Sequence, residues 1–365
     1  MKLLISGGGT GGHVFPAIAI ADAVKCLVPD VEILFVGALG KIEMQKVPEA
    51  GYRIIGLPIR GIQRNLSIEN VKLVYRLMKC MWMAKNILKE FQPDVVVGVG
   101  GYASGPMLRM ASWFTIPILI QEQNSYPGIT NRLLAKAAQK ICVAFEGMEN
   151  YFQKNKIILT GNPVRTAFKA QHDRVEARTY FGLEKSKFTI GVFGGSLGAR
   201  AMNDAIISMS LNISERNDIQ WIWQTGSMYA EEMQKSSLAT ATNVKMLPFV
   251  DRIDIAYSAC DLVVARAGAL TLAELCILGT PCILVPSPNV AEDHQRKNAE
   301  AITGKGAAKM ILDADLKNCL WNEIIKLLEN SEEREKMSFE LKQLAKPDAD
   351  LNIAKAILTL VKVAV

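Results

Sequence analysis

The stretch that decides the fold is Gly-Gly-Gly-Thr-Gly-Gly-His at residues 7–13, between an apolar run at residues 2–6 and a helical pattern that opens at Pro16. The apolar run has the composition of a buried strand, and proline is favoured in the first turn of a helix. The glycines therefore predict a turn from a strand into a helix N-terminus. Such a turn exposes backbone N–H groups at the positive end of a helix dipole, which suits a phosphate. A structural turn without a ligand is the alternative, but five glycines and a histidine exceed what that turn needs.

Three of these glycines also match the G-x-G-x-x-G spacing of dinucleotide-binding folds. That motif requires an acidic residue at the end of the second strand, where it binds a ribose. The second expected strand, residues 31–36, carries Glu32 at its start instead, so a nicotinamide cofactor is disfavoured. His13 would project from the strand end toward a bound ligand, with a packing role as the alternative.

Length and composition describe an ordinary globular protein. The 365 residues fit two domains, and fractions of 50% hydrophobic and 21% charged residues exclude a disordered chain. We expect no membrane-spanning segment and no signal peptide, because the apolar runs are short. Seven scattered cysteines without a C-x-x-C pair indicate neither a metal site nor disulfides, which suits a reducing cytosol. The net charge of +6 is mild, and we expect no nucleic-acid partner.

Strand and helix patterns alternate along the chain, which predicts an α/β protein with doubly wound parallel sheets. Two further glycine-rich turns follow apolar strands, at residues 100–106 and 194–200. A polar stretch precedes the last of these strands, where the pattern restarts. We therefore expect two Rossmann-like domains, residues 1–165 and 166–345, facing a central cleft. A C-terminal helix at about residues 346–365 is expected to pack back on the first domain.

Two acidic residues occupy positions where α/β sheets place ligand contacts. Glu122 belongs to the polar sequence Gln-Glu-Gln-Asn at residues 121–124, which follows an apolar strand. Glu274 lies about one turn into a helix whose N-terminus suits a diphosphate, so its carboxylate is placed to accept hydrogen bonds from a ribose diol. An equally weighted alternative for Glu274 is a helix-dipole partner or a surface ion pair.

Residues 60–91 form an unusually basic segment with large apolar side chains at helical spacing. Its basic residues, against two glutamates, are Arg60, Arg64, Lys72, Arg76, Lys79, Lys85 and Lys89. One interpretation is a core-facing helix with a solvated basic face. The other is a surface that lies on anionic lipid. The segment alone favours the first interpretation.

Taken together, the motifs resemble glycosyltransferase family 28, and within it the MurG family of bacterial cell-wall synthesis. The resemblance covers essentially the whole chain and rests on motifs that occur in the same order. They lie at residues 9–13, 100–106, 122–124, 161–165, 194–200 and 266–271, followed by Glu274 and Gln295. The resemblance implies the GT-B fold. It also implies inverting transfer of N-acetylglucosamine (GlcNAc) from UDP-GlcNAc to the C4 hydroxyl of lipid I, undecaprenyl-diphospho-MurNAc-pentapeptide, which forms lipid II.

The resemblance assigns the donor mainly to the second domain, with Glu274 at the ribose and the Val250 backbone at the uracil. Further donor contacts are implied for Thr10, Gly11, Gly12, Asn124, Arg165, Ser196, Ala269, Leu270, Thr271, Leu272, Ala273 and Gln295. The N-terminal glycine loops, with Gly101, Tyr102 and Ser104, would hold the acceptor diphosphate. His13 is implied as the general base and Glu122 is a second candidate.

Two positions depart from the family pattern. Gln121 stands where many members have histidine, so we expect no proton-transfer role there. His294 stands where some members have a glutamine, which leaves the sugar contact from that position open.

The resemblance further implies catalysis without a metal or other cofactor, because helix dipoles and backbone amides would stabilise the departing UDP. Since lipid I is a membrane lipid, it implies a peripheral protein on the cytoplasmic face of the bacterial inner membrane, which now favours the lipid-facing interpretation of residues 60–91. Anionic membrane lipid and other cell-wall synthesis proteins are candidate partners. A UDP-GlcNAc 2-epimerase-like enzyme on the same fold is the first alternative, and a non-catalytic nucleotide-sugar binder is the second.

Overall fold

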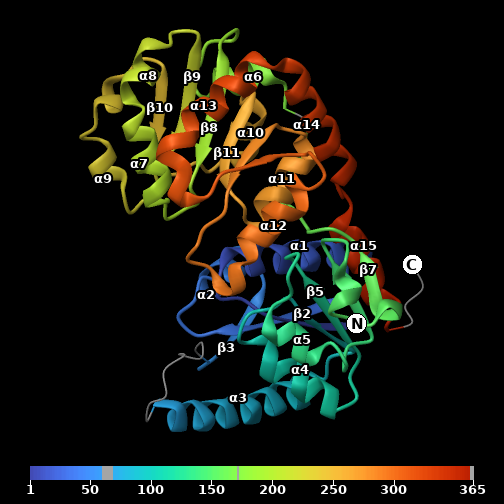
Figure 1. Ribbon diagram of the computed structural model, residues 1–365. Helices are drawn as coiled ribbons and strands as arrows, with labels where there is room; N and C mark the ends of the chain where they lie inside the picture. The colour runs from blue at the N-terminus through green and yellow to red at the C-terminus, as the bar shows by residue number, and fades with distance from the viewer. Residues whose placement is uncertain (60–68, 171, 362–365) are drawn as a thin grey trace. The chain divides into compact units, whose positions relative to one another are not determined.

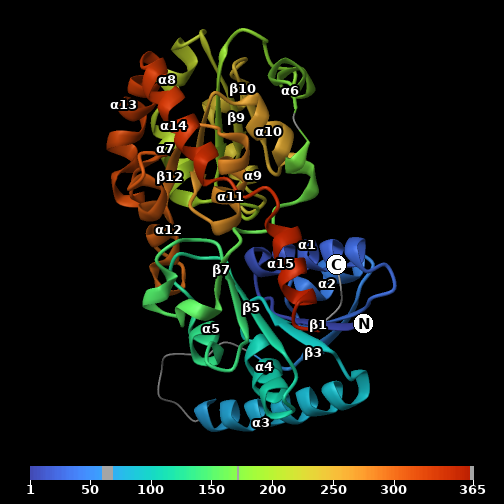
Figure 2. The same ribbon diagram turned by 90° about the vertical axis from the view of Figure 1, so that its right-hand side faces the viewer.

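The computed structural model describes residues 1–59, 69–170 and 172–361, with only the backbone described at residues 69–75 and 291. The chain divides into two compact units, drawn in Figures 1 and 2. Unit 1 consists of Met1–Arg165 together with Lys346–Val365, and unit 2 consists of Thr166–Ala345. Each unit has its own parallel sheet and its own hydrophobic core.

Unit 1 is built on a seven-stranded sheet in which all neighbouring strands are parallel. Its strands are β1 (Lys2–Ser6), β2 (Glu32–Ala38), β3 (Arg53–Leu57), β4 (Val95–Gly98), β5 (Ile118–Glu122), β6 (Lys140–Val143) and β7 (Ile157–Leu159). Their order is β3-β2-β1-β4-β5-β6-β7, so the winding direction reverses between β1 and β4. At such a switch point, α/β proteins bind ligands beside the carboxyl ends of the strands.

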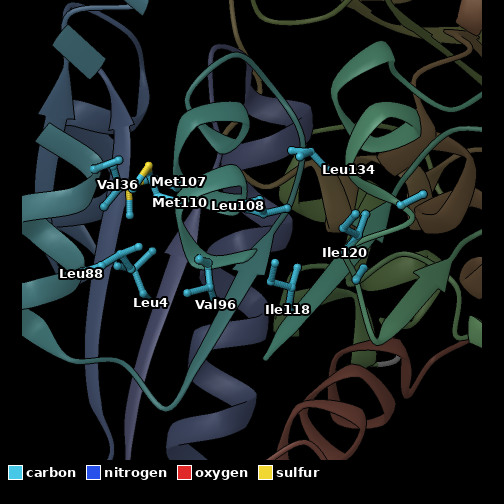
Figure 3. Packing of buried hydrophobic residues seen from close by; sticks show 14 of the residues in the cluster. Leu4, Val36, Leu88, Val96, Met107, Leu108, Met110, Ile118, Ile120 and Leu134 are labelled. Carbon is cyan, nitrogen blue, oxygen red and sulfur yellow. The ribbon is translucent and has the colours of Figure 1, made fainter. Parts of the chain in front are cut away.

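Helices cover both faces of this sheet (Figures 1 and 2). They are α1 (Gly11–Leu27), α2 (Glu43–Glu49), α3 (Glu69–Phe91), α4 (Ser104–Trp113), α5 (Ile129–Leu134) and α15 (Ala349–Leu358), with short 3-10 turns at Met148–Asn150 and Lys154–Lys156. Successive strand residues face opposite sides, so Leu4 packs with Leu88 of α3 and Met107 of α4, as Figure 3 shows. Leu3 and Ile5 pack in the cluster that contains α1 and α15.

Helix α15 belongs to unit 1, although unit 2 precedes it in the chain. Its residues Ile353 and Ile357 are fully buried in one cluster with Val24 of α1. The returning chain also passes close to Gly161, where a Cβ atom would lie 2.3 Å from the Cβ of Lys346. Glycine is therefore required at that crossing, where φ is +84°.

Unit 2 repeats the plan with a six-stranded parallel sheet in the order β10-β9-β8-β11-β12-β13. The strands are β8 (Phe188–Phe193), β9 (Ile219–Gln224), β10 (Val244–Leu247), β11 (Leu262–Arg266), β12 (Cys282–Val285) and β13 (Lys309–Met310). The helices are α6 (Arg174–Tyr180), α7 (Arg200–Ser208), α8 (Ser210–Glu215), α9 (Ala230–Met233), α10 (Ile253–Ala259), α11 (Ala269–Leu278), α12 (His294–Thr303), α13 (Leu316–Glu329) and α14 (Ser331–Leu344). Short 3-10 turns lie at Thr166–Lys169, Ser237–Thr240, Ala291–Asp293 and Asp313–Asp315.

The largest side chains in the core of unit 2 are two tryptophans of β9. Trp221 and Trp223 of β9 are almost completely buried against α7 and α13. On the other side of the sheet, the rings of Phe193 and Tyr257 meet edge to face with centroids 5.0 Å apart. Two parallel sheets with helices on their faces confirm the predicted α/β, doubly wound architecture.

The start of α1 differs from the prediction. The helix begins at Gly11, so Pro16 is its sixth residue and lies in the second turn rather than the first. Glycines contribute no apolar side chains, so hydrophobic periodicity did not reveal the first turn of the helix. At this position proline removes the intrahelical hydrogen bond that its own N–H would donate, and its ring crowds the carbonyl of Gly12.

The basic segment is helical where it is described. Residues 60–68, with Arg60 and Arg64, lie outside the described residues, and α3 begins at Glu69. The buried stripe of α3 contains Cys80, Ala84, Ile87, Leu88 and Phe91. Within the described residues, no helix is both long and apolar enough to cross a membrane.

Candidate active site

The first glycine loop leads from β1 into α1, and its first three amides are bound within unit 1. The amide of Gly7 donates to the carbonyl of Val36 (3.2 Å), that of Gly8 to the carbonyl of Gly100 (3.3 Å), and that of Gly9 to the Glu43 carboxylate (2.9 Å). No described residue accepts a hydrogen bond from the amides of the next three residues, 10–12. These amides open α1, where the helix dipole is positive, so an anion fits at this position rather than at residues 7–9.

Thr10 is the N-cap residue of α1, but it does not cap the helix in the usual way. An N-cap hydroxyl normally accepts a hydrogen bond from an amide of the first turn. Here the Thr10 hydroxyl lies 2.9 Å from Nδ1 of His13, and its side chain makes no cap hydrogen bond. The amides of Gly11 and Gly12 therefore stay available to a ligand, and the His13 imidazole is oriented.

The second glycine loop follows β4 and touches the first loop through its backbone. Gly100 and Gly101 have φ of +89° and +83°, and a Cβ on Gly101 would lie 2.2 Å from the carbonyl oxygen of Gly8. A Cβ on Gly100 would lie 2.9 Å from Nε2 of His13. The Nε2 edge of the imidazole therefore faces the loop where the acceptor diphosphate is predicted.

The three residues predicted to contact the acceptor diphosphate differ in exposure. Tyr102 is exposed and Gly101 is half-buried, so both are accessible. Ser104 is fully buried, and its hydroxyl donates to the carbonyl of Gly101 (2.9 Å). Its geometry supports a role in holding the loop and gives no support to the predicted direct contact.

The carboxylate of Glu122 is buried at the end of β5, with 1% of the residue exposed. One oxygen accepts from the amide (3.0 Å) and the side chain (3.3 Å) of Asn124, and the other accepts from the Gly128 amide (3.1 Å) and the Asn131 side chain (2.8 Å). Burial raises the pKa of this carboxyl, and these donors act in the opposite direction. With both oxygens engaged and no surface access, Glu122 is placed to hold the loop at residues 124–128, and the structure gives no support to a role as general base.

Neighbouring amide side chains complete this buried network. Gln121 donates to Asn162 (3.0 Å), Asn162 donates to the carbonyl of Gln123 (2.9 Å), and Gln123 donates to the carbonyl of Val99 (2.8 Å). Gln121 therefore takes part in the buried hydrogen-bond network. The network fixes Asn124, which is half-buried just beyond β5.

In unit 2, the loop with Ser196 lies against the loop that follows β9. A Cβ on Gly226 would lie 2.1 Å from the Cα of Gly198, and the Ser227 amide donates to the carbonyl of Ser196 (3.3 Å). Ser196 itself is exposed. The close approach of the two glycines keeps this hydroxyl at the carboxyl edge of the sheet.

Gln224, which sequence reasoning missed, connects two parts of the predicted donor site. Its side chain donates to the carbonyl of Gly195 (2.8 Å) and accepts from the amide of Val250 (3.0 Å). The glycine loop that carries Ser196, a predicted donor contact, and the backbone predicted to meet the uracil are therefore held by one amide group. The sequence did contain a clue, because Gln224 is the polar last residue of an apolar strand. Polar residues at the carboxyl ends of parallel strands lie where ligands bind.

The predicted residues of α11 occupy its first two turns. The helix begins at Ala269, so the amides of residues 269–271 lie in the turn that has no intrahelical acceptors. Leu272 is buried, and its amide donates to the carbonyl of Gly268 (3.0 Å), while Ala273 is half-buried. Glu274 is only 5% exposed, which excludes the alternative of a surface ion pair.

The remaining predicted residues lie near the same edges. The Gln295 side chain of α12 accepts from the amide of Ser287 (2.9 Å), which fixes the loop after β12, and His294 is the first residue of that helix. Arg165 is exposed at the end of the first segment of unit 1. Within each unit, the predicted residues thus lie near the carboxyl edge of its sheet.

Two parallel-sheet units in tandem, each with glycine turns at its ligand edge, define a protein of the GT-B class. Residues 3–143 match the glycosyltransferase family 28 N-terminal domain, and residues 189–353 match the glycosyltransferase family 28 C-terminal domain. The chain belongs to glycosyltransferase family 28.

Relatives of known name span the whole chain. A Bacteroides fragilis protein named UDP-N-acetylglucosamine–N-acetylmuramyl-(pentapeptide) pyrophosphoryl-undecaprenol N-acetylglucosamine transferase is 49% identical over 99% of this chain and 96% of its own length. A Parabacteroides distasonis protein of the same name is 51% identical over 94% of both chains. The family resemblance inferred from the motifs is confirmed.

Solved structures agree with this fold. The crystal structure of Acinetobacter baumannii MurG has a TM-score of 0.78 and 27% identity, and the match covers 98% of this chain and 99% of that one. A UDP-GlcNAc 2-epimerase from Neisseria meningitidis has a TM-score of 0.68 at 16% identity, covering 98% of this chain and 100% of its own, a likeness of fold alone. The predicted GT-B fold is confirmed.

The burial of Glu122 predicts how stability depends on pH. Because its folded-state pKa is raised, the folded chain binds more protons than the unfolded chain between the ordinary pKa of 4.5 and the raised value. The contribution of Glu122 to the free energy of unfolding therefore falls as pH rises through that range. Glu122→Gln removes this titration, so unfolding free energy measured by urea denaturation from pH 4.5 upward should decline less steeply than in the unmodified protein.

The control is Glu49→Gln. Hydrogen bonds from Lys46 and Gln45 lower the pKa of this exposed carboxyl from its ordinary value of 4.5, so it contributes no decline of stability as pH rises. Its variant should keep the slope of the unmodified protein. If the unfolding free energies of Glu122→Gln and of the unmodified protein decline equally with pH, the raised pKa of Glu122 is contradicted.

Proposed function

We propose that this chain transfers GlcNAc from UDP-GlcNAc to the C4 hydroxyl of lipid I, with inversion at the anomeric carbon, and so forms lipid II. The observation that carries the proposal is its identity of 49% over 99% of the chain to a relative named for this transfer. The position of His13 beside two glycine loops supplies a group suited to the chemistry.

His13 is the general base in this proposal. When Nδ1 carries the ring proton and donates a hydrogen bond to the Thr10 hydroxyl, Nε2 carries the lone pair that can take up a second proton. Nε2 takes the proton of the acceptor C4 hydroxyl as that oxygen bonds to the anomeric carbon and the bond to UDP breaks. The hydroxyl proton ends on the imidazole, and the bonding electrons leave with the diphosphate of UDP.

The departing UDP needs stabilisation of its charge. The N-terminus of α11 and the loop of Ser196 supply backbone amides and a helix dipole for it. Glu274 would accept hydrogen bonds from the ribose, and the loop after β10, with Val250, would meet the uracil. We propose that no metal or other cofactor takes part, which transfer in the presence of EDTA would test.

The direct test is an assay of UDP release from UDP-GlcNAc, with and without a lipid I analogue. Release that depends on the analogue, together with a product that contains GlcNAc, supports the proposal. The alternative on the same fold is epimerisation. Conversion of UDP-GlcNAc to its 2-epimer without an acceptor would favour that alternative, and binding of UDP with neither reaction would favour a nucleotide-sugar binder.

We also propose peripheral attachment to the cytoplasmic face of the bacterial inner membrane through the outer stripe of α3. Met78 and Trp82 are 67% and 64% exposed, and Lys85 and Lys89 follow at helical spacing on the same side. This stripe is opposite the buried one. Trp113 at the end of α4 is also 67% exposed, which adds apolar surface within unit 1. Other cell-wall synthesis proteins remain candidate partners.

His13→Ala should fold normally and lose about 10²–10⁴ in turnover, the usual cost of removing a general base. Thr10→Val removes only the hydroxyl that orients the imidazole, so turnover should fall roughly fivefold, the equivalent of about 1 kcal/mol for one hydrogen bond. Thr10→Ser, which keeps a hydroxyl, is the matched control and should retain turnover. Steady-state kinetics at saturating substrate measure all three, and an active His13→Ala variant would rule out the assignment.

Glu274→Gln should raise the Michaelis constant for UDP-GlcNAc roughly tenfold to a hundredfold, because a charged hydrogen bond contributes about 1.5–3 kcal/mol. The constant for the acceptor should change little. Glu300→Gln, an exposed glutamate of unit 2 paired with Arg296, is the control. An unchanged constant in a folded Glu274→Gln variant would show that this carboxylate does not bind the donor.

The α3 surface should bind vesicles that contain anionic lipid. Each basic residue near such a surface contributes about 1 kcal/mol before salt screening, so Lys85→Gln with Lys89→Gln should weaken sedimentation most at low salt. Met78→Ser with Trp82→Ser should weaken it at all salt concentrations. Leu211→Ser, an exposed leucine of unit 2, is the control. Transfer to a short, water-soluble acceptor should persist in every variant, and absence of vesicle binding by the unmodified protein would refute the attachment.

A further inference from the structure

Glu43 is a buried carboxylate beneath the first glycine loop. It is the first residue of α2 and only 1% of it is exposed. Oε2 accepts from the Gly9 amide (2.9 Å), and Oε1 accepts from the Ala38 amide at the end of β2 (2.9 Å). The two oxygens thus join the glycine loop of β1 to the end of the neighbouring strand.

The surrounding glycines make room for this side chain. A Cβ on Gly8 would lie 2.3 Å from the Glu43 carboxyl, and a Cβ on Gly37 would lie 2.5 Å from its Cγ. A side chain at either position would collide with the carboxylate. The packing of Glu43 therefore requires glycine at both positions.

The charge of Glu43 is stabilised by amides rather than by a cation. Among the described residues, no lysine, arginine or histidine forms an ion pair with it. A buried carboxylate is tolerated when hydrogen bonds replace its lost hydration. Because it takes the Gly9 amide and places negative charge under residues 7–9, it disfavours a phosphate there and leaves the amides of residues 10–12 for one.

We propose that Glu43 is a positioning residue that sets where the first glycine loop binds a diphosphate. It holds Gly9 at φ of +95° and directs an anion to the N-terminus of α1, beside His13. The functional part rests on the proposed transfer to lipid I, whose diphosphate would be the anion. Glu43 itself touches no substrate.

The test is Glu43→Gln, which keeps the shape of the side chain. The glutamine side chain has only one oxygen to accept from the Gly9 and Ala38 amides. Its NH₂ group would face whichever amide the oxygen does not reach. Hydrogen exchange of the Gly9 amide should become at least tenfold faster. Inorganic pyrophosphate should slow exchange at residues 10–12 in the unmodified protein and less so in the variant. The Michaelis constant for a lipid I analogue should rise at least tenfold, and by a larger factor than the constant for UDP-GlcNAc, which residues 10–12 are also predicted to contact.

Asp94→Asn is the matched control. Asp94 also accepts from a backbone amide, that of Lys2 (2.7 Å), but at the amino end of the unit 1 sheet. Its variant should leave exchange at residues 9–12 and acceptor kinetics unchanged. Glu43→Ala removes both acceptor oxygens, so its effects on exchange and on the acceptor constant should equal or exceed those of Glu43→Gln. If the alanine variant does not fold, the test rests on the glutamine variant alone.

The outcomes separate this inference from the proposed function. Unchanged exchange at Gly9 in Glu43→Gln, or no effect of pyrophosphate on residues 10–12 of the unmodified protein, overturns the inference even if transfer occurs. Equal losses of UDP affinity and acceptor binding also overturn it, since they would indicate general loss of structure. If the unmodified protein does not transfer GlcNAc, the proposed function fails, and the exchange measurements still decide the role of Glu43.

Discussion

The candidate site of unit 1 depends on close backbone contact between its two glycine loops. Gly8 donates to the carbonyl of Gly100, and any side chain on Gly101 would collide with Gly8. Because nothing separates the loops, the N-terminus of α1 and the imidazole of His13 lie beside the loop after β4. Unit 2 uses the same device at Gly198 and Gly226. In both units, direct contact between main chains brings amides to the carboxyl edge of the sheet.

Buried polar side chains keep these loops in shape. Glu122 holds the loop after β5, Gln224 links the loops after β8 and β10, and Glu43 joins the first glycine loop to β2. Each must find hydrogen-bond partners because unpaired polar groups are costly inside a protein. The partners are mostly backbone groups, so satisfying the side chain also fixes the loop. In the proposed function, proton transfer belongs to the more accessible His13, while the buried carboxylates maintain the geometry of the loops.

Helix α3 has a buried inner stripe and an exposed outer stripe. Its inner stripe joins the core of unit 1 with Leu4 and Met107, as any amphipathic helix does. Its outer stripe carries exposed Met78 and Trp82 with lysines nearby, and core packing does not explain that stripe. A helix with apolar residues on both sides is suited to the boundary between a protein core and a lipid surface. In the proposed function, unit 1 combines an edge that binds the acceptor diphosphate with a helix that lies on the membrane.

The sequence by itself determined the fold class and the loops of the ligand edge, because apolar strands and glycine turns are local patterns of neighbouring residues. It also carried the family motifs. It could not show that the Thr10 hydroxyl bonds to His13, that Glu122 lacks surface access, or that Glu43 and Gln224 hold loops at the ligand edges. Those facts depend on partners from separate segments, such as Gly9 and Glu43, which are 34 positions apart. Only tertiary structure decides such contacts, because burial and hydrogen bonding are set by neighbours in space.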